Sequence, residues 1–512
     1  MVKINTITES ILEVKTDGIA FILEDGFEVS KDIKNKIKEF GIDILKLFKK
    51  QNFTGKAKSS VSILIPEKNG FKNVFFVGMG CCCNKMEKIA ENYRQAIGIA
   101  IGLAEKNNIE SLAIEIPEGC KKFKELNEAY FAHQTVKTAI VASYKFNEFL
   151  TSKEKKDKKL KELILVSKGK NKKLIEESVE LAKVLGNAVN EARRWIDLPA
   201  NKFYPAIAEE EARKIAKEQG LKIKVFGEDQ IKKMGMGGLA GVSSGSEQDC
   251  KFIILEYKTS KKNAKTLAFI GKGVTFDSGG LSLKPSRGPG SMETMKEDMS
   301  GASAVLGAMK AIAQLKPDVN VFGVLAVTEN LPGDGALKPG DIVTFYNGKT
   351  GEVLNTDAEG RLILADALAY TEKELKPDVM IDIATLTGAC VYAVGPFYSG
   401  LFSCNENLIE KIKEAGNITG DKVWPLPIDS DYRKAMLSDI ADVRNTSKPG
   451  YYAGATTAAL FLKEFVKETE WAHIDIGGTA FNVPDRPYLG NGATGVGVSL
   501  LVELAMNWNK KK

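Results

Sequence analysis

The sequence is poor in histidine, in long apolar runs and in excess charge of one sign. Only His133 and His473 occur among 512 residues, and no H-E-x-x-H motif is present, which argues strongly against a zinc site with two or three histidine ligands. The apolar run Ala96–Ala104 is far shorter than the about 20 residues that a membrane-spanning helix needs. The net charge of +6 gives no reason to expect a nucleic-acid or membrane partner. Any metal centre must therefore consist mainly of carboxylates.

The cysteine usage gives no sign of a disulfide framework. Three of the seven cysteines are consecutive, Cys81–Cys83, and the pattern suits reduced thiols inside a cell. A soft metal could bind this run, but no histidine lies near it in the sequence, so buried or idle thiols are favoured. The segment Met1–Gly18 lacks a sustained apolar core, so no signal peptide is predicted. We expect a soluble, cytoplasmic protein.

The length predicts two domains, because single cores stop growing at about 250–300 residues. Short apolar strands alternate with longer amphipathic stretches, which is the α/β pattern. We predict a smaller N-terminal α/β domain over residues 1–170 and a linker helix over 171–194. A larger α/β domain follows over 195–512, with a mixed, mostly parallel sheet between helices. The hinge is set by the break at Asp197-Leu198-Pro199-Ala200-Asn201.

Charged residues gather in glycine-rich segments near predicted strand ends, where sheets of this class bind ligands. The segment Gly271–Gly280 carries Lys272 and Asp277 and continues to Lys284. Lys272 and Asp277 are five positions apart and would point to opposite faces of a straight strand, so we expect a turn to bring them together. A helix is predicted over residues 300–315, following a strand over 266–270.

Two further segments add three carboxylates and an arginine. Asp298 comes just before the helix that we expect Ser300 to cap. Asp357, Glu359 and Arg361 recur at a spacing of two, so an extended stretch would present all three on one side. Four clustered carboxylates, Asp277 included, cannot all stay ionised without compensation. Two divalent cations sharing bridging carboxylates are the simplest solution, and such a pair suits hydrolysis.

The segment that carries Asp357, Glu359 and Arg361 resembles the signature of the leucine (cytosol) aminopeptidases, a family with a dinuclear metal site. Residues 355–362 read N-T-D-A-E-G-R-L, and residues 271–280 (G-K-G-V-T-F-D-S-G-G) and 295–302 (M-K-E-D-M-S-G-A) are similar to the family's two other site segments. The likeness covers essentially the whole second domain, continuing through 382–389, 438–445 and 473–478. The first domain is similar to the family's variable N-terminal domain only through residues 71–80 and 197–201.

The resemblance implies two metals held by one lysine and four carboxylates. One metal would be bound by Asp277, Asp357 and Glu359, and the other by Lys272, Asp277, Asp298 and Glu359, so that Asp277 and Glu359 bridge. Lys272 would be a neutral amine ligand, because adjacent dications depress the pKa of an ammonium group. The ions would be Zn²⁺, with Zn²⁺, Mn²⁺, Mg²⁺ or Co²⁺ at the exchangeable site.

Lys284 and Arg361 are the catalytic residues that the resemblance implies. Lys284 would stay charged and stabilise the gem-diolate oxyanion. Arg361 would hold a bicarbonate that acts as the general base. The bicarbonate site would be formed by Gly360, Arg361 and Leu386, near the N-terminus of the following helix.

Met295, Thr385 and Gly388 match the positions that shape the family's first side-chain pocket. A thioether beside a glycine offers an adaptable apolar slot, which favours leucine or methionine over charged residues.

The resemblance therefore implies a metal-dependent aminopeptidase that removes N-terminal residues, leucine by preference, from short peptides by attack of a water that two metals activate. It also implies a homohexamer, a dimer of trimers, whose sites face a shared cavity. The residues alone support a two-metal hydrolase, so a non-peptide amide or a phosphoester remains an alternative substrate. A third alternative is an additional DNA-binding or scaffold role, against which the small net charge argues.

Overall fold

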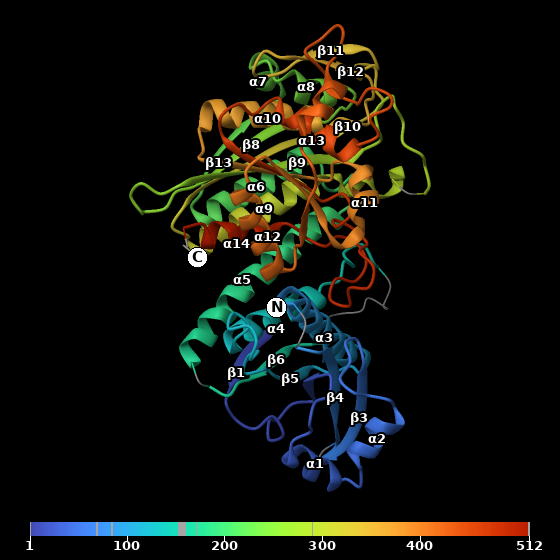
Figure 1. Ribbon diagram of the computed structural model, residues 1–512, viewed down its shortest axis with the longest axis vertical. Coiled ribbons are helices and arrows are strands. Elements are labelled where there is room, and N and C mark those ends of the chain that lie inside the picture. Colours follow the sequence, from blue (N-terminus) through green and yellow to red (C-terminus); the bar gives the residue numbers. More distant parts are fainter. Residues whose placement is uncertain are drawn as a thin grey trace. The chain divides into compact units, whose positions relative to one another are not determined.

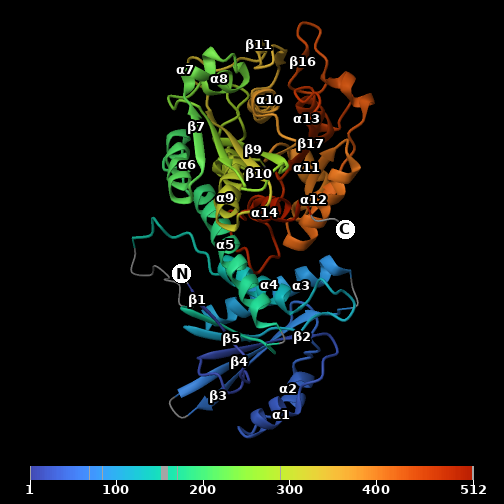
Figure 2. The same ribbon diagram turned by 90° about the vertical axis from the view of Figure 1, so that its left-hand side faces the viewer.

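The computed structural model describes residues 2–67, 70–82, 85–151, 160–169, 171–288 and 290–509. The chain forms two compact units, residues 1–190 with 485–490 and residues 191–484 with 491–512 (Figures 1 and 2). Each unit packs helices on its own sheet, which confirms the predicted two-domain α/β class. Among the described residues, no helix combines the length and the apolar character needed to cross a membrane.

The first unit is built on a six-stranded sheet in the order β1-β6-β5-β2-β4-β3, in which only the edge strand β3 is antiparallel to its neighbour. Its strands are β1 (Lys3–Ile7), β2 (Gly18–Glu24), β3 (Ser60–Glu67), β4 (Gly70–Gly80), β5 (Ser111–Glu115) and β6 (Glu162–Val166). Its helices are α1 (Lys31–Lys38), α2 (Ile44–Lys50), α3 (Met86–Lys106) and α4 (Glu128–Ala142), and α5 (Lys172–Asp197) leads into the second unit.

Strand β4 shows why this sheet is covered on both faces. Its apolar residues alternate, so Phe75 and Val77 enter the core under α3 and α4, whereas Val74 and Phe76 enter the core under α1 and α2. A strand that is buried on both faces has a nearly continuous apolar sequence, as residues 74–77 do.

The thiols only partly follow the prediction. Cys82, Cys120, Cys250, Cys390 and Cys404 are free, as expected for reduced cysteines. Cys81 departs from that expectation because it is disulfide-bonded. Cys83 lies outside the described residues.

The second unit is built on an eight-stranded mixed sheet in the order β15-β14-β17-β13-β9-β10-β8-β7. Its strands are β7 (Lys222–Phe226), β8 (Lys251–Tyr257), β9 (Thr266–Asp277), β10 (Asn320–Asn330), β13 (Val379–Ala384), β14 (Ser399–Ser403), β15 (Val423–Pro425) and β17 (Glu470–Asp475). A small second sheet comprises β11 (Asp341–Thr344), β12 (Thr350–Val353) and β16 (Val443–Arg444).

Helices cover both faces of the large sheet (Figure 1). Helices α8 (Gly237–Ser243), α10 (Gly360–Tyr370) and α13 (Gly454–Lys463) pack on one face. The other face carries α6 (Pro205–Gln219), α9 (Ser300–Leu315) and α14 (Val498–Asn507). The remaining helices are α7 (Glu228–Lys233), α11 (Gly388–Val394) and α12 (Glu406–Thr419).

Two glycines let α9 approach the sheet closely. A Cβ at Gly271 of β9 would lie 2.6 Å from the Cα of Ala302, and one at Gly301 would lie 2.3 Å from the carbonyl oxygen of Ile383. No side chain fits at either position, so the start of α9 rests directly on β9 and β13. This contact brings Asp298, which just precedes the helix, to the middle of the sheet edge.

Candidate active site

Four central strands bring the candidate residues to one edge of the large sheet. Strands β9, β10, β13 and β17 are mutually parallel, so their carboxyl ends meet at the same edge. Asp277 ends β9, Asn330 ends β10, Asp475 ends β17, and Thr385 follows β13. This is where the strand-end rule locates ligands in α/β sheets.

A β-bulge, rather than the predicted turn, brings Lys272 and Asp277 together. Strand β9 runs on through Asp277, and Val274 pairs with Thr328 whereas Asp277 pairs with Asn330, so β9 carries one extra residue. The extra residue reverses the alternation of side chains after Val274. Lys272 and Asp277, five positions apart, therefore emerge on the same side of the strand.

The segment before α9 also differs from the prediction. Ser300 is the first residue of the helix and not its N-cap, which is Met299, and the Ser300 hydroxyl donates back to the Glu297 carbonyl over 2.5 Å. Asp298 lies in a 3₁₀ turn over Met292–Met299 and is buried. This turn directs the Asp298 carboxylate at Lys272, whose Nζ lies 2.7 Å from Oδ1.

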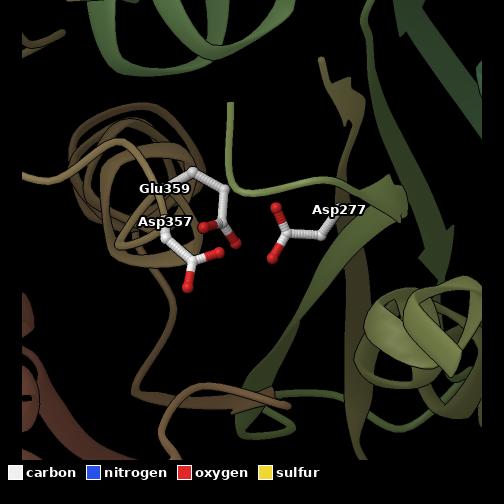
Figure 3. A group of neighbouring side chains, drawn as sticks. All are labelled: Asp277, Asp357 and Glu359. Carbon is white, nitrogen blue, oxygen red and sulfur yellow. The ribbon is translucent and has the colours of Figure 1, made fainter. Parts of the chain in front are cut away.

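The signature segment forms a turn and a helix start instead of the predicted extended stretch. The Asp357 amide donates to the Asn355 side chain over 2.8 Å, Glu359 has helical dihedral angles, and α10 begins at Gly360. The turn nevertheless gathers carboxylates: ligand oxygens of Asp277, Asp357 and Glu359 lie within 4.8 Å of one another (Figure 3).

Lys272 is enclosed by carboxylates at the centre of the site. Its Nζ lies 2.9 Å from Glu359 Oε1, in addition to its contact with Asp298, and donates to the Thr385 carbonyl over 2.8 Å. Burial alone lowers the pKa of Lys272, but the carboxylates of Asp298 and Glu359 outweigh it and raise that pKa. Gly360 packs on this side chain, because a Cβ there would meet Lys272 Cε at 2.6 Å.

Lys284 contacts the other side of the cluster. Its Nζ lies 2.9 Å from Asp277 Oδ2 and 2.6 Å from Asp357 Oδ1. Asp277 is further held by the Asn330 side-chain amide, which donates to Oδ1 over 2.8 Å, and by the Gly279 amide over 2.9 Å.

The site as described has more negative than positive charge. Four carboxylates share it with two lysines, so full ionisation leaves two negative charges without a partner. Burial, followed by repulsion from Glu359, raises the pKa of Asp277 to about 7, and burial also raises the pKa of Asp298. Among the described side chains, Asp298 Oδ2 and Glu359 Oε2 are buried without a hydrogen-bond partner. Unsatisfied oxygens and uncompensated charge both fit divalent cations.

Arg361 is buried beside this cluster in the first turn of α10. Its Nη1 donates to the Asn445 carbonyl over 2.7 Å, and within the described part of the chain Nε has no partner. Burial lowers the pKa of Arg361 to about 10. The Leu386 amide, predicted as an anion donor, already donates to Asp475 Oδ1 over 3.2 Å, so a bound anion would share it.

The three predicted pocket residues lie around the same edge. Met295 is buried in the 3₁₀ turn that carries Asp298, and the Thr385 hydroxyl donates to Asp298 Oδ1 over 2.7 Å. Gly388 begins α11, and a Cβ built there meets nothing within 4 Å. Open space at Gly388 suits a pocket wall.

The sequence analysis missed Asn330 and Asn445. Asn330 is the last residue of β10, so the strand-end rule could have identified it. Asn445 is fully buried; its side-chain oxygen accepts the Leu354 amide over 2.8 Å and its amide donates to the Asn355 carbonyl over 2.6 Å. It thus holds the signature turn from a distant segment, a role that no local pattern signals.

This fold and this edge define a class of protein: a two-domain α/β protein with a carboxylate-rich site of the kind that metal-dependent hydrolases use. The cytosol aminopeptidase family, catalytic domain, matches residues 190–502, and the family's N-terminal domain matches residues 22–153. Together these two matches span most of the chain.

Curated relatives and solved structures agree with the family match. A probable cytosol aminopeptidase of Aquifex aeolicus (strain VF5) is 39% identical over 513 residues, covering 98% of each chain. That of Chlorobaculum tepidum is 43% identical over 433 residues, covering 82% of this chain and 84% of the relative. A tomato leucine aminopeptidase mutant superposes with a TM-score of 0.87 at 31% identity, covering 99% of this chain and 97% of that one. The bottromycin maturation enzyme BotP in complex with Mn superposes with a TM-score of 0.83 at 28% identity, covering 97% and 100%.

The chain belongs to the cytosol aminopeptidase family. It is a metal-dependent aminopeptidase, a hydrolase that acts on peptides from their N-terminal end. The predicted family and enzyme class are confirmed, and the phosphoester alternative is not favoured.

Proposed function

We propose that this aminopeptidase removes N-terminal residues, leucine by preference, from short peptides with a free N-terminus, and that it uses two divalent metal ions per chain. The observation that supports this most is the group of Asp277, Asp357 and Glu359 oxygens within 4.8 Å of one another, joined to Asp298 through Lys272. The donor set is oxygen-rich with one amine, which suits Zn²⁺, Mn²⁺, Mg²⁺ or Co²⁺.

The metal ligands are proposed as two overlapping sets. Asp277, Asp357 and Glu359 hold one ion, and Lys272, Asp277, Asp298 and Glu359 hold the other, with Asp277 and Glu359 shared. The unsatisfied Asp298 Oδ2 and Glu359 Oε2 support this division, since each offers a free lone pair. A pair of divalent ions in such a site lowers the pKa of bound water and polarises a carbonyl oxygen.

Lys284 and Arg361 are proposed to stabilise the negative charges involved in the reaction, on the oxyanion and on a bound bicarbonate. The Lys284 ammonium lies against Asp277 and Asp357, and with these carboxylates bound to cations it would be available to stabilise the oxyanion at the scissile carbonyl. The partnerless Nε of Arg361 supports binding of a bicarbonate at the start of α10, with the Gly360 and Leu386 backbone. A bicarbonate held there would supply the general base for the attacking water.

Selectivity for the first residue is proposed to reside in Met295, Thr385 and Gly388. Met295 is an adaptable apolar wall, and the space beyond Gly388 admits a side chain. Each additional buried methylene stabilises binding by about 0.8 kcal/mol, so selectivity is graded and not absolute.

We also propose an assembly, a location and a division of roles along the chain. We propose a homohexamer, a dimer of trimers, in the cytoplasm, with residues 195–512 catalytic, 171–194 a linker helix and 1–170 serving assembly. The relatives' names as cytosol aminopeptidases support the location.

A substrate panel tests the proposal. Leucyl, methionyl, glutamyl and N-acetyl-leucyl amides are assayed beside a phosphoester, with Zn²⁺ or Mn²⁺ added. We expect fast hydrolysis of the leucyl and methionyl amides, slow hydrolysis of the glutamyl amide, and none of the N-acetyl compound. Preference for the glutamyl amide would overturn the pocket assignment, and phosphoester hydrolysis above amide hydrolysis would overturn the substrate class.

A further inference from the structure

Asn330 is the last residue of β10 and lies beside the proposed metal ligand Asp277. The two residues are register partners in the parallel pair of β9 and β10, directly after the bulge in β9. Asn330 is only 4% exposed, so its side-chain amide has to find its partners inside the protein. It carries no charge and is not among the proposed metal ligands. Any effect that it has on the site must therefore come through the residues that it contacts.

The side-chain amide of Asn330 joins the two segments that carry the carboxylates. Its Nδ2 donates to Asp277 Oδ1 over 2.8 Å and to the Thr356 carbonyl over 3.0 Å, so both amide hydrogens are used. Because a carboxylate and a carbonyl both accept hydrogen bonds, the amide nitrogen and not the amide oxygen must face them. An aspartate has the same shape, but it would add a third acceptor and a further negative charge at this point.

The backbone around Asn330 fixes the chain directly after Asp277. The Asn330 carbonyl accepts the Ser278 amide over 3.0 Å and the Ser278 hydroxyl over 2.7 Å. Asp277 Oδ1 accepts the Gly279 amide over 2.9 Å in addition to its bond from Asn330. Two N–H groups therefore hold Oδ1, and Oδ2, which lies 2.9 Å from Lys284 Nζ, is the oxygen left to face the cluster.

A second set of hydrogen bonds ties the same two segments without touching a carboxylate. The Thr356 hydroxyl donates to the Gly279 carbonyl over 2.6 Å and accepts the Ser282 amide over 2.8 Å. The Thr356 amide donates to the Ser282 hydroxyl over 3.1 Å. These bonds hold the backbone of the loop after β9 against the signature turn. Removing the Asn330 side chain should therefore leave that backbone in place and release the orientation of the Asp277 carboxylate.

We propose that Asn330 is a positioning residue of the metal centre, which orients the Asp277 carboxylate and links it to the signature turn before any cation binds. This inference rests on the proposed two-metal site. Hydrogen bonds from outside a ligand set orient the ligands, and their loss typically costs about 10–100-fold in metal affinity or activity.

The test measures metal affinity as well as activity. Asn330→Ala removes both donors, and Asn330→Leu removes them while keeping the same branched skeleton. Asn320→Ala is the matched control, because Asn320 begins β10 at the opposite end of the strand and bonds there to the Thr259 amide and the Thr266 hydroxyl. The full chain of each protein is stripped of metal and its thermal midpoint is recorded. The dissociation constants of Mn²⁺ and Zn²⁺ are then measured by competition with a chelator.

We expect both Asn330 variants to stay folded and to bind the ions about 10–100-fold more weakly than wild type, whereas Asn320→Ala should bind them as wild type does. Hydrolysis of leucyl amide by the Asn330 variants should recover as metal is added in excess, which a misfolded site would not allow.

Wild-type affinity in Asn330→Ala would overturn the role of Asn330, and wild-type affinity in Asn330→Leu would reduce that role to packing and overturn it too. Loss of a cooperative thermal transition in both variants would also overturn it, because Asn330 would then hold the fold and not one ligand. Fewer than two ions in wild type would instead contradict the proposed metal centre itself, and the role of Asn330 with it.

Discussion

Replacing Gly360 with alanine tests whether the position of Lys272 controls the metal centre. The new Cβ would lie 2.6 Å from Lys272 Cε, 2.7 Å from Nζ and 2.8 Å from Cδ, well inside van der Waals contact. The backbone of Gly360 is held at the first turn of α10, so the lysine must yield. Relieving these contacts needs a displacement of roughly 1 Å, because carbon atoms prefer separations of about 3.5–4.0 Å.

Such a displacement separates the Lys272 amine from its partners. Its Nζ now lies 2.7 Å from Asp298 and 2.9 Å from Glu359, and misplacing a reacting group by about 1 Å can cost about 10²-fold in rate. We therefore expect Gly360→Ala to lower kcat about 10²-fold and to lose the second metal. Overpacking should reduce stability by about 1–3 kcal/mol.

The assay measures kcat on leucyl amide, metal content by mass spectrometry and the thermal midpoint. Gly102→Ala is the matched control, because Gly102 lies within α3 and a Cβ there meets nothing within 4 Å. It should leave activity and metal content unchanged and stabilise the helix by about 0.5–1 kcal/mol. Full activity with full metal content in Gly360→Ala would refute the reasoning.

Three further predictions concern the base, an acid-sensitive histidine and assembly. Arg361→Ala should keep its metals but lower kcat, since general-base steps contribute about 10²–10⁴-fold to the rate. Added bicarbonate should stimulate wild type more than the variant, and equal stimulation would remove Arg361 from the mechanism. Burial lowers the pKa of His133 to about 3 from 6.5, so the unfolded chain takes up the proton first and stability falls as the pH drops below 6.5. The loss is about 1.4 kcal/mol per pH unit, so in urea unfolding the pH dependences of wild type and His133→Gln should differ by this amount; parallel pH dependences would contradict it. Light scattering should give a mass near six times 55.8 kDa, whereas a fully active monomer would contradict the hexamer.

The sequence predicts the elements of the second unit well where patterns are local. The apolar run of β9 and the helix at 300–315 follow from periodicity, and the clustering of Asp277, Asp298 and Glu359 follows from their places in segments near predicted strand ends. The geometry by which they cluster does not follow. Lys272 and Asp277 converge through a β-bulge, whose extra residue is visible only when β9 is paired with β10.

Contacts between segments far apart in the chain could not be predicted from the sequence either. Asn445 holds residues 354 and 355 and accepts a hydrogen bond from Arg361, although it lies more than 80 positions away. The spacing of Asp357 and Glu359 predicts an extended stretch, but the structure has the Asn355 turn there and a helix that starts at Gly360, which packs on Lys272. Tertiary contacts therefore override local periodicity at the site.

Metal counting in a Glu359→Ala variant tests the central claim most directly, because Glu359 is proposed to bridge both ions. The control is Glu374→Ala, which removes a carboxylate outside the site that accepts a hydrogen bond from the Tyr346 hydroxyl. All three proteins, wild type, Glu359→Ala and Glu374→Ala, are dialysed against Zn²⁺ and analysed by mass spectrometry. The account predicts two metals per chain in wild type and control, and none in Glu359→Ala. The same variant should also lose the hydrolysis of leucyl amide. Two metals retained in Glu359→Ala would contradict it.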